Sequence, residues 1–429
     1  MYRAIYLVMV LSCVHLSLGT PSLRAKNPES ELAAAPTATW PQWRGVGRDS
    51  KLVATAPWPD RLAAPALEQS WRVELGPSYS SPVVSSSLVF VTETVDQKRE
   101  VVRALDRATG AEQWQASWEG AMTVPFFAKA NGDWIRATPA FDGQTLFVAG
   151  MRDVLVAIDA SNGQVRWQVD FVKELGTPLP DFGFVSSPLV VGDHIYVQAG
   201  ASLCKLDKST GKVLWRALED AGGMFGSAFS SPYLAELAGR QQLLVQTRTH
   251  LAGVDPDQGD VLWSKEIPTF RGMNILTPTT AGDTVFTSAY GGKSFLLACR
   301  RDGEKYAIDE AWTNKVTAYM SSPVVIDGHL YLHLRNRRFT CLELATGETR
   351  WTTEPFGEYW SMVANGDRIL ALDERGELLL IHATPEKFDL LDSRKISEEP
   401  CWAHLAVCGD ELFIRELHAL AAYRWRAAP

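Results

Sequence analysis

Few residues of this chain have the types and spacing that known chemistry requires. His329 and His333 stand four residues apart, a spacing that brings two zinc ligands together on a helix. Their neighbours predict a strand instead, on which four residues span about 13 Å, too far for one metal ion to bind both side chains. We therefore expect these histidines to be packed or solvated.

A second candidate is the acidic segment Asp255–Asp260, which is followed by Glu266 and resembles a calcium-binding loop. An EF-hand loop requires glycine at its sixth position, where Asp260 stands, and the same turn recurs elsewhere in the chain. The sequence therefore predicts a structural turn here and no metal site.

Motifs for other chemistries are missing from the sequence. It contains no GxSxG nucleophile elbow, no HExxH zinc motif, no phosphate loop and no adjacent or CxxC cysteine pair. Cys401 and Cys408 could pair across a hairpin or remain free, whereas Cys204, Cys299 and Cys341 occupy apolar strand positions and are expected in the core. No residue is predicted to be catalytic.

The dominant pattern is a repeat that returns about every 40 to 50 residues. Its form is small-x-Asp-x-x-Thr-Gly-x-x-x-Trp, and each copy follows a Ser-Pro or Thr-Pro dipeptide by roughly thirty residues. The copies are ALDRATGAEQW, AIDASNGQVRW, KLDKSTGKVLW, GVDPDQGDVLW and CLELATGETRW. A repeat of this length indicates a solenoid, a propeller or another array.

Each repeat divides into four short apolar stretches separated by turn residues, which predicts a four-stranded antiparallel sheet. Sheets of this kind in tandem form a β-propeller, so the predicted fold is all-β with eight blades. The expected blade starts are Ser81, Thr138, Ser187, Ser231, Thr277, Ser322, Met362 and His404. The last repeat has only three strands, so we expect residues 69–75 to pair with it and close the ring.

The repeated tryptophans have a structural interpretation because a catalytic group would not be needed in every blade. Each is expected on an outer strand, where the indole fills the wedge between neighbouring blades. These blade-docking residues are Trp71, Trp114, Trp167, Trp215, Trp263 and Trp351.

The N-terminus resembles an export signal, with Arg3 before an apolar run and small residues at the end of that run. We expect a signal peptide at 1–19, a disordered linker at 20–39, a Trp- and Pro-rich segment at 40–65 that packs on the propeller, and the propeller at 66–429. Cys13 lies in an imperfect lipoprotein box, which leaves a membrane tether as an alternative to a freely exported chain in the periplasm or outside the cell.

The balance of charges argues against nucleic acid as a partner. The formal net charge is -8, and binding to a phosphate backbone requires a basic face. A protein partner, a small ligand or a glycan remains possible on this ground.

The repeats, together with WPQWRG at 40–45 and HATPEKFDLL at 382–391, closely resemble the tryptophan-docking repeats of the pyrroloquinoline-quinone-like (PQQ-like) β-propeller family. One branch of that family contains quinone-dependent dehydrogenases with PQQ and calcium. The other is typified by BamB, an assembly-factor lipoprotein of the envelope that performs no chemistry. The resemblance implies the second branch, because the adjacent cysteines and the Glu, Asn and Asp residues of the first cannot be matched here.

The segments between blades are rich in aromatic and arginine side chains, which are enriched in binding hot spots. We expect them to surround the mouth of the central channel and to bind a protein or small ligand, without a cofactor. The candidate residues are Trp134, Arg136, Phe184, Arg271, Asn274, Tyr319, Arg335, Arg337, Trp360, Trp402 and His404. The leading hypothesis is a non-catalytic scaffold, and the alternatives are a PQQ- or metal-dependent oxidoreductase and a glycan-binding module.

Overall fold

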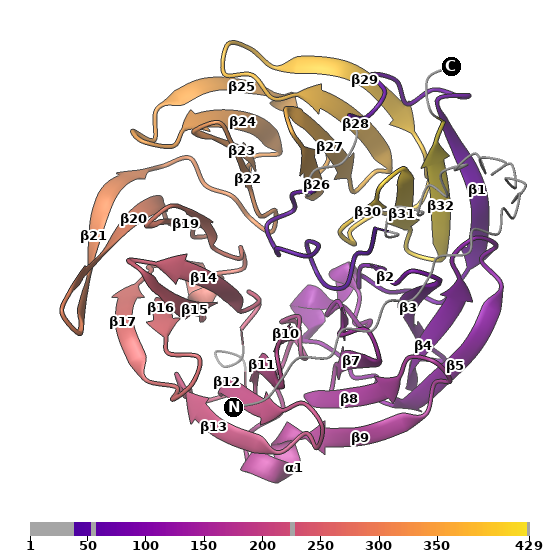
Figure 1. Cartoon of the computed structure of the whole chain (residues 1–429), viewed down its shortest axis with the longest axis horizontal. Helices are drawn as coiled ribbons and strands as arrows, with labels where there is room; N and C mark the ends of the chain where they lie inside the picture. The colour runs from indigo at the N-terminus through magenta and orange to yellow at the C-terminus, as the bar shows by residue number, and fades with distance from the viewer. Residues whose placement is uncertain (1–37, 53–56, 224–227, 427–429) are drawn as a thin grey trace, which may run out of the picture. The chain divides into compact units, whose positions relative to one another are not determined.

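The computed structural model describes residues 38–52, 57–223 and 228–426. The predicted signal peptide, Cys13 and residues 20–37 of the predicted linker lie outside the described residues. All of these described residues belong to one compact unit. Within the described part, eight four-stranded antiparallel sheets follow one another as blades around a common centre, which confirms the predicted eight-bladed β-propeller (Figure 1).

The first four blades contain sixteen strands in chain order. Blade 1 consists of β2 (Val83–Val84), β3 (Leu88–Val95), β4 (Arg99–Asp106) and β5 (Glu112–Glu119). Blade 2 consists of β6 (Ala140–Phe141), β7 (Thr145–Gly150), β8 (Val154–Asp159) and β9 (Val165–Asp170). Blade 3 consists of β10 (Leu189–Val191), β11 (His194–Ala199), β12 (Ser202–Asp207) and β13 (Val213–Ala217), and blade 4 of β14 (Tyr233–Leu237), β15 (Arg240–Gln246), β16 (His250–Val254) and β17 (Val261–Glu266).

The remaining blades complete the ring. Blade 5 consists of β18 (Thr279–Ala281), β19 (Thr284–Ser288), β20 (Ser294–Asp302) and β21 (Lys305–Asn314), and blade 6 of β22 (Val324–Ile326), β23 (His329–His333), β24 (Arg338–Glu343) and β25 (Thr349–Pro355). Blade 7 consists of β26 (Trp360–Asn365), β27 (Arg368–Asp373), β28 (Glu377–His382) and β29 (Asp389–Lys395). Blade 8 consists of β30 (Ala406–Cys408), β31 (Glu411–Arg415), β32 (Ala419–Trp425) and β1 (Leu67–Glu74).

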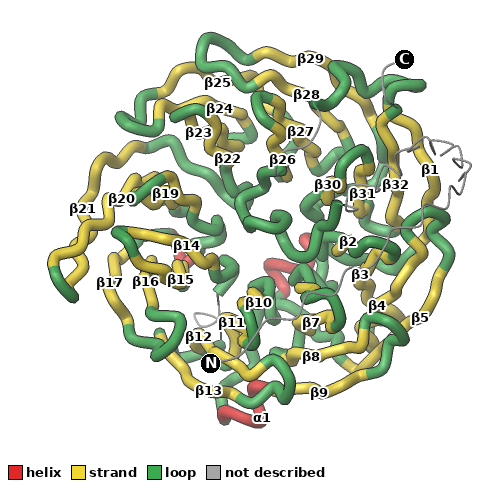
Figure 2. Tube along the Cα trace, viewed as in Figure 1, coloured by secondary structure: helices red, strands yellow, loops and turns green. Residues whose placement is uncertain are grey.

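Helices are few and short in the described part, as the red segments of Figure 2 show. The 3-10 helices η1 (Phe126–Asn131) and η2 (Phe270–Gly272) lie in the connections that follow blades 1 and 4, and α1 (Phe171–Leu175) follows blade 2. Such connections between the outer strand of one blade and the inner strand of the next are called interblade segments below. They carry most of the predicted site residues.

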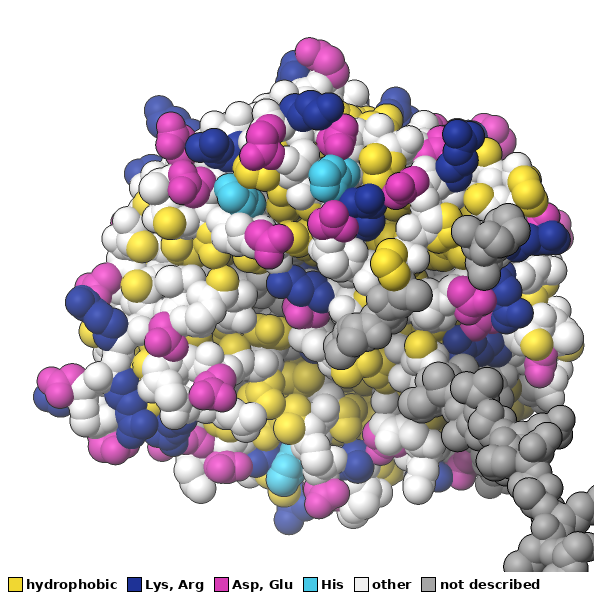
Figure 3. Space-filling view, turned by 45° about the horizontal axis from the view of Figure 1, so that its top comes forward, with side chains coloured by type: hydrophobic (Ala, Val, Ile, Leu, Met, Phe, Trp, Pro, Cys, Tyr) yellow, Lys and Arg dark blue, Asp and Glu magenta, His cyan; other side chains and the backbone are white. Residues whose placement is uncertain are grey.

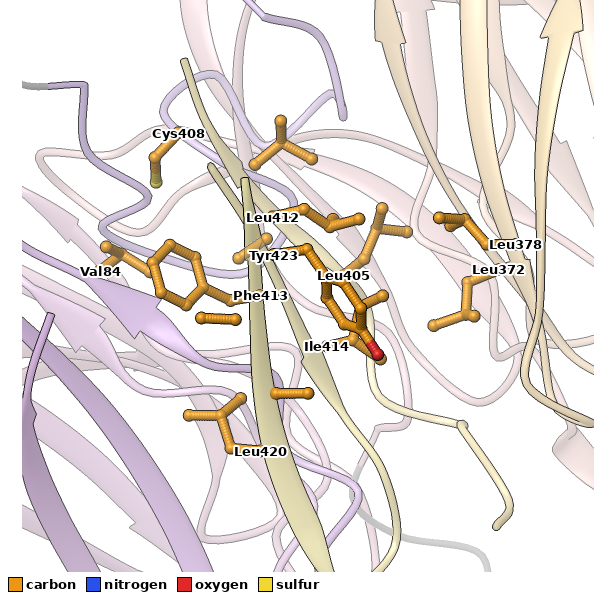
Figure 4. Packing of buried hydrophobic residues seen from close by; sticks show 14 of the residues in the cluster. Val84, Leu372, Leu378, Leu405, Cys408, Leu412, Phe413, Ile414, Leu420 and Tyr423 are labelled. Atoms are coloured by element: carbon orange, nitrogen blue, oxygen red, sulfur yellow. The ribbon is translucent and has the colours of Figure 1, made fainter. Parts of the chain in front are cut away.

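Blade 8 is completed by the strand that comes first in the chain. β1 pairs antiparallel with β32, with Leu67 opposite Trp425 and Glu74 opposite Ala419. The core of this blade packs against both of its neighbours, since it contacts Val84 of blade 1 and Leu372 of blade 7 (Figure 4). The predicted closure is therefore confirmed, because the start of the chain supplies the fourth strand of the last blade.

The repeated tryptophans join neighbouring blades in the way the repeat predicts. The Trp114 indole of blade 1 donates to the Ala160 carbonyl of blade 2 at 2.9 Å, and its ring covers Gly163. A Cβ at Gly163 would approach the ring to 2.7 Å, and the φ of 78° there also favours glycine. Equivalent indole-to-carbonyl bonds come from Trp71, Trp167, Trp215, Trp312 and Trp351.

Trp263 packs against the next blade but departs from this pattern in its hydrogen bond. Its indole nitrogen donates to the Gln242 side chain within its own blade. Blade 5 lacks the tight turn that would receive it and has the long β20–β21 hairpin instead, whose Ile308 packs with Trp263 in one core cluster. Trp312, at the end of that hairpin, docks on blade 6 and was not predicted to do so.

The recurring aspartates are turn residues, as expected. Asp207 accepts hydrogen bonds from the backbone and hydroxyl groups of Ser209 and Thr210. The bonds from the Ser209 and Thr210 hydroxyls lower the pKa of Asp207 to about 2. The corresponding Asp255 accepts from the Asp257 and Gln258 amides and pairs with Arg240, so it has the same structural role.

A buried carboxylate links blade 2 to blade 3. One oxygen of Asp153 accepts from the Gly200 amide at 2.8 Å, and the other has no partner among the described residues. Burial, against the opposing effect of that hydrogen bond, raises the pKa of Asp153 to about 7. The folded state therefore holds this proton at a pH where the unfolded chain has released it.

Replacement of this carboxylate tests the electrostatic cost of the link. Because the folded pKa lies above the unfolded value, stability is greatest at low pH and falls as the pH rises toward 7. Asp153→Asn removes this dependence and tolerates the φ of 58° at this position. As the pH rises from 4 to 8, the free energy of unfolding of the variant minus that of the wild type should increase by up to about 4 kcal/mol. If urea unfolding shows the same dependence of stability on pH for the wild type and for Asp153→Asn, the pKa of Asp153 is not raised by folding.

Candidate functional site

A cavity of about 480 Å³ lies at the end of the channel surrounded by interblade segments. Phe127 and Phe270 line it while remaining more than half exposed, so the cavity is open to solvent on this side. Its wall also includes Tyr79, Arg136, Phe182, Phe229, Arg248, Arg271, Tyr319, Tyr359, Trp360 and Trp402. A volume of this size is typical of small-ligand sites.

The aromatic side chains at the mouth form two series of ring contacts. One runs from Trp134 through Tyr79, Trp402, Tyr359 and Tyr319 to Tyr290, with neighbouring centroids 4.2 to 5.8 Å apart. The other runs through Phe126, Phe127, Phe182 and Phe229, with centroids 5.4 to 6.3 Å apart. Because each ring braces the next, the wall is held in place by packing.

A set of hydroxyl groups that we call the hydroxyl girdle forms the base of the wall. It consists of Ser81, Thr138, Ser187, Ser231, Thr277 and Ser322, all of which line the cavity. The backbone amide of each of the first five donates to the hydroxyl of the next blade, at 2.9 to 3.2 Å. These are the Ser-Pro and Thr-Pro positions of the repeat, and their hydroxyls connect the inner strands.

The channel is closed by an N-terminal segment, residues 40–52, which we call the plug. Figure 1 shows this part of the chain, in indigo, crossing the centre of the ring. Trp40 pairs with Val84 and the Pro41 carbonyl accepts from Phe141, at the ends of β2 and β6 that lie farthest from the cavity. Trp43 lines the cavity itself. The plug therefore spans the channel and converts it into a blind cup.

Two buried arginines hold the plug to opposite sides of the ring. Arg48 donates to the carbonyls of Ser187 and Pro188 in blade 3, at 3.0 and 2.9 Å. Arg44 donates to the Pro323 carbonyl before blade 6, at 2.6 Å. Both side chains are at most 2% exposed, and burial lowers the pKa of Arg48 to about 9, so the cation persists at neutral pH. Backbone carbonyls thus accept from these cations in place of carboxylates, although the Nε of Arg48 has no partner among the described residues.

His404 connects the plug to blade 8. Its Nδ1 lies 2.8 Å from the Leu405 carbonyl and its Nε2 lies 3.1 Å from Ser50, which in turn accepts from Arg44. Burial, together with the nearby Arg44 cation, lowers the pKa of His404 to about 4. We assign the neutral tautomer with hydrogen on Nδ1, because this tautomer satisfies every group in the network. The residue positions the plug.

The chemistry of the cavity wall is one-sided. Arg136, Arg248 and Arg271 line it, and none of them forms an ion pair with a described residue. The lining contains no aspartate or glutamate. No group of three or more His, Cys, Asp or Glu side chains with metal-binding geometry occurs in the described residues. The wall therefore combines guanidinium groups, hydroxyl groups and aromatic surfaces.

The structure brings six of the eleven predicted site residues to the cavity: Arg136, Arg271, Tyr319, Trp360, Trp402 and His404. The other five lie elsewhere. Trp134 packs behind Tyr79, and Arg335 lies over the Tyr290 ring. Phe184 is in the core, Asn274 holds the backbone at Arg248 and Ile267, and Arg337 pairs with Glu358.

Several residues of the cup were not among the predicted site residues. The hydroxyl girdle was visible only as a repeated dipeptide, and Arg248 only as a loop residue of blade 4. The plug has no counterpart in the repeats, and its two buried arginines, Arg44 and Arg48, belong to no repeated pattern.

All five described cysteines are buried and free, so Cys401 and Cys408 do not pair.

Comparison with known families matches residues 98–353, more than half of the chain, to the family described as outer membrane protein assembly factor BamB. The BamB protein of Yersinia pestis is 22% identical over 256 residues, which cover 57% of this chain and 62% of the relative. The BamB protein of Shewanella oneidensis is 23% identical over 333 residues, covering 75% of this chain and 73% of the relative. The chain thus spans less than two thirds of the length of the Yersinia protein.

Among solved structures, BamB from Moraxella catarrhalis matches with a TM-score of 0.62 and 15% identity, covering 84% of this chain and 100% of that one. A europium-containing methanol dehydrogenase matches with a TM-score of 0.52 and 11% identity, covering 90% and 98%. At these identities the likeness shows the fold alone. Within the described residues, no helix has the length and apolar character needed to cross a membrane.

Loss of a plug cation should weaken the whole propeller. Arg48→Met keeps an apolar stem of similar length but leaves the Ser187 and Pro188 carbonyls unsatisfied, which should cost about 1 to 3 kcal/mol. Arg61→Met, at an exposed arginine outside the plug, is the matched control and should change stability by less than about 0.5 kcal/mol. Urea denaturation measures both, and equal midpoints for the two variants would show that Arg48 does not hold the plug.

Proposed function

The chain belongs to the outer membrane protein assembly factor BamB family of PQQ-like repeat propellers, and from that premise we propose that it is a non-catalytic scaffold of the cell envelope. In this proposal it binds a protein partner through the face formed by the interblade segments. Its relatives' name associates them with assembly of outer membrane proteins, and we assign this chain to the same kind of process.

The observation that carries the proposal is an exposed aromatic group at the rim of the cup. Phe126 is 86% exposed, and Phe127 and Phe270 beside the mouth are 54% and 53% exposed. Large exposed aromatic side chains are rare on surfaces that meet only water and are enriched where proteins bind one another. Phe126 and Phe127 lie on η1, in the long interblade insertion after blade 1.

The dehydrogenase alternative finds no support in the residues of the cup. A quinone site of that branch requires carboxylate and amide ligands for calcium, whereas the cavity lining has neither Asp nor Glu. The residues present therefore do not fit that cofactor pair.

Location follows from the same proposal. We place the chain on the periplasmic side of the envelope, with the predicted signal peptide directing export. A lipid on Cys13 remains a prediction, and mass spectrometry of the mature N-terminus would decide between a tethered and a free chain.

The rim can be tested in cells with one substitution. In a strain lacking this chain, expression of the wild type should restore outer membrane protein levels, and Phe126→Asp should restore less than half as much, because a carboxylate at a packed contact must be desolvated. Leu214→Asp, at a 46% exposed residue of the outer strand β13, is the control and should restore fully. Full restoration by Phe126→Asp at wild-type abundance would contradict the proposal.

A further inference from the structure

We propose that the cup also binds a small ligand of defined chemistry: a flat aromatic body that carries one oxyanion group, a carboxylate or a phosphate. This inference is independent of the protein partner at the rim, because it rests on the interior of the cavity. It is carried by three arginines that form no ion pair with a described residue, by the aromatic wall and by the size of the space.

Arg248 is the centre of the anion site. Its side chain is only 5% exposed, its Nη2 donates to the Arg271 carbonyl at 2.9 Å, and its Nε donates to the Gly272 carbonyl. Its Nη1 is buried and has no hydrogen-bond partner among the described residues, so an anion in the cup would pair with it after a small shift of the side chain toward the cavity. The guanidinium also lies 4.4 Å from the Phe229 ring centroid, which fixes its plane. A buried donor left unpaired on a cation is costly unless a ligand completes it.

Two more cations enter the cup from other interblade segments. Arg136 donates to the carbonyls of Trp134 and Gly132, at 3.1 and 3.0 Å. Arg271 lies over the Phe270 ring at 5.1 Å and is exposed at the mouth. Neither forms an ion pair within the described residues, although the outer surface carries charges of both signs side by side (Figure 3).

The charge of the cavity lining, compared with the net charge of the chain, indicates that the ligand is an anion. The whole chain has a formal net charge of -8, yet the cavity lining contains three arginines and no carboxylate. A concave site lined by one sign of charge with apolar walls concentrates the opposite charge. Arginine in particular matches the planar oxygens of carboxylates and phosphates. The cup is therefore positive inside an acidic protein.

The walls give the shape of the ligand. Phe127, Phe182 and Phe229 contact one another on the side of the cup that carries Arg248. Tyr79, Tyr359 and Trp402 are stacked or edge-on to each other on the other side. A flat ring system gains stacking contacts with such walls. A bicyclic aromatic molecule is well within the 480 Å³ available.

The test is isothermal titration of the full chain with three matched probes: 2-naphthoate, 2-naphthyl phosphate and the neutral 2-naphthamide. The two anions should bind at least tenfold more tightly than the amide, and their affinity should fall as salt rises from 50 to 500 mM. The tighter of the two anions identifies the oxyanion. Equal binding of anion and amide, or no binding of any probe, would overturn the proposal.

Variants assign the binding to the cup. Arg248→Met should weaken binding of the anions at least tenfold and leave the amide unchanged. Because Arg248 also holds the Arg271–Gly272 backbone, Arg271→Gln provides a second test, with an expected loss of about threefold. Arg335→Met, at a cation outside the cavity lining, is the control. Anion affinities that neither cavity variant lowers would refute the site.

The design separates this proposal from the scaffold function. Phe126 does not line the cavity, so Phe126→Asp should bind the anionic probes as the wild type does. If the wild type binds the anionic probes but Phe126→Asp fully restores outer membrane protein levels, the ligand site is supported and the scaffold proposal fails. If no probe binds but Phe126→Asp fails to restore those levels, the scaffold proposal is supported and the ligand site fails.

Discussion

The pairing of β1 with β32 is the constraint on which the rest of this structure depends. Without β1 the last blade would have only three strands, and the strand that completes it comes from the start of the chain, so the first and last parts of the ring share one sheet. The seam is reinforced by side chains: Trp71 docks on blade 1, and the buried Arg415 of blade 8 donates to the carbonyls of Gly76 and Thr92. Closure therefore joins the first and last repeats with the same kind of contact that joins the others.

Closure also creates the place where function is located. In a closed ring the inner strands converge, so their first residues form the hydroxyl girdle and the interblade segments surround one mouth. The plug then enters from the far end, and its two arginines reach blades 3 and 6. An open array would have no enclosed centre for this segment to fill. The blind cup is thus a consequence of ring geometry.

How much could be predicted from the sequence follows from what repeats. The blade number was predicted because the starts of the inner strands recur, and seven of the eight inner strands begin two residues after the predicted starts. In six of those seven, a Ser-Pro or Thr-Pro dipeptide directly precedes the strand. Trp263 packs on the next blade without the indole-to-carbonyl bond of the other tryptophans, because a long hairpin replaces the turn that would accept it. The docking contact is a property of two repeats, whereas the motif describes one.

The candidate site was harder to predict because interblade segments do not repeat. Phe184 and Phe182 are two residues apart, yet the first is in the core and the second lines the cavity. The direction in which a side chain of an interblade segment points depends on the local backbone, as at Arg271, whose φ is 51°. The sequence predicted that the N-terminal segment packs on the propeller but not that it crosses the channel. The contacts that hold it there are bonds from single arginines to backbone carbonyls, which produce no repeated sequence pattern.

Hydrogen exchange of the intact chain, followed by mass spectrometry, tests the central claim most directly. If β1 completes blade 8, the alternate amides of residues 67–74 that face β32 should be protected, while those on the outer edge of the sheet exchange freely, because β1 is hydrogen-bonded on one side only. Rapid exchange across 67–74 while residues 411–425 remain protected would mean that the ring is not closed by this strand.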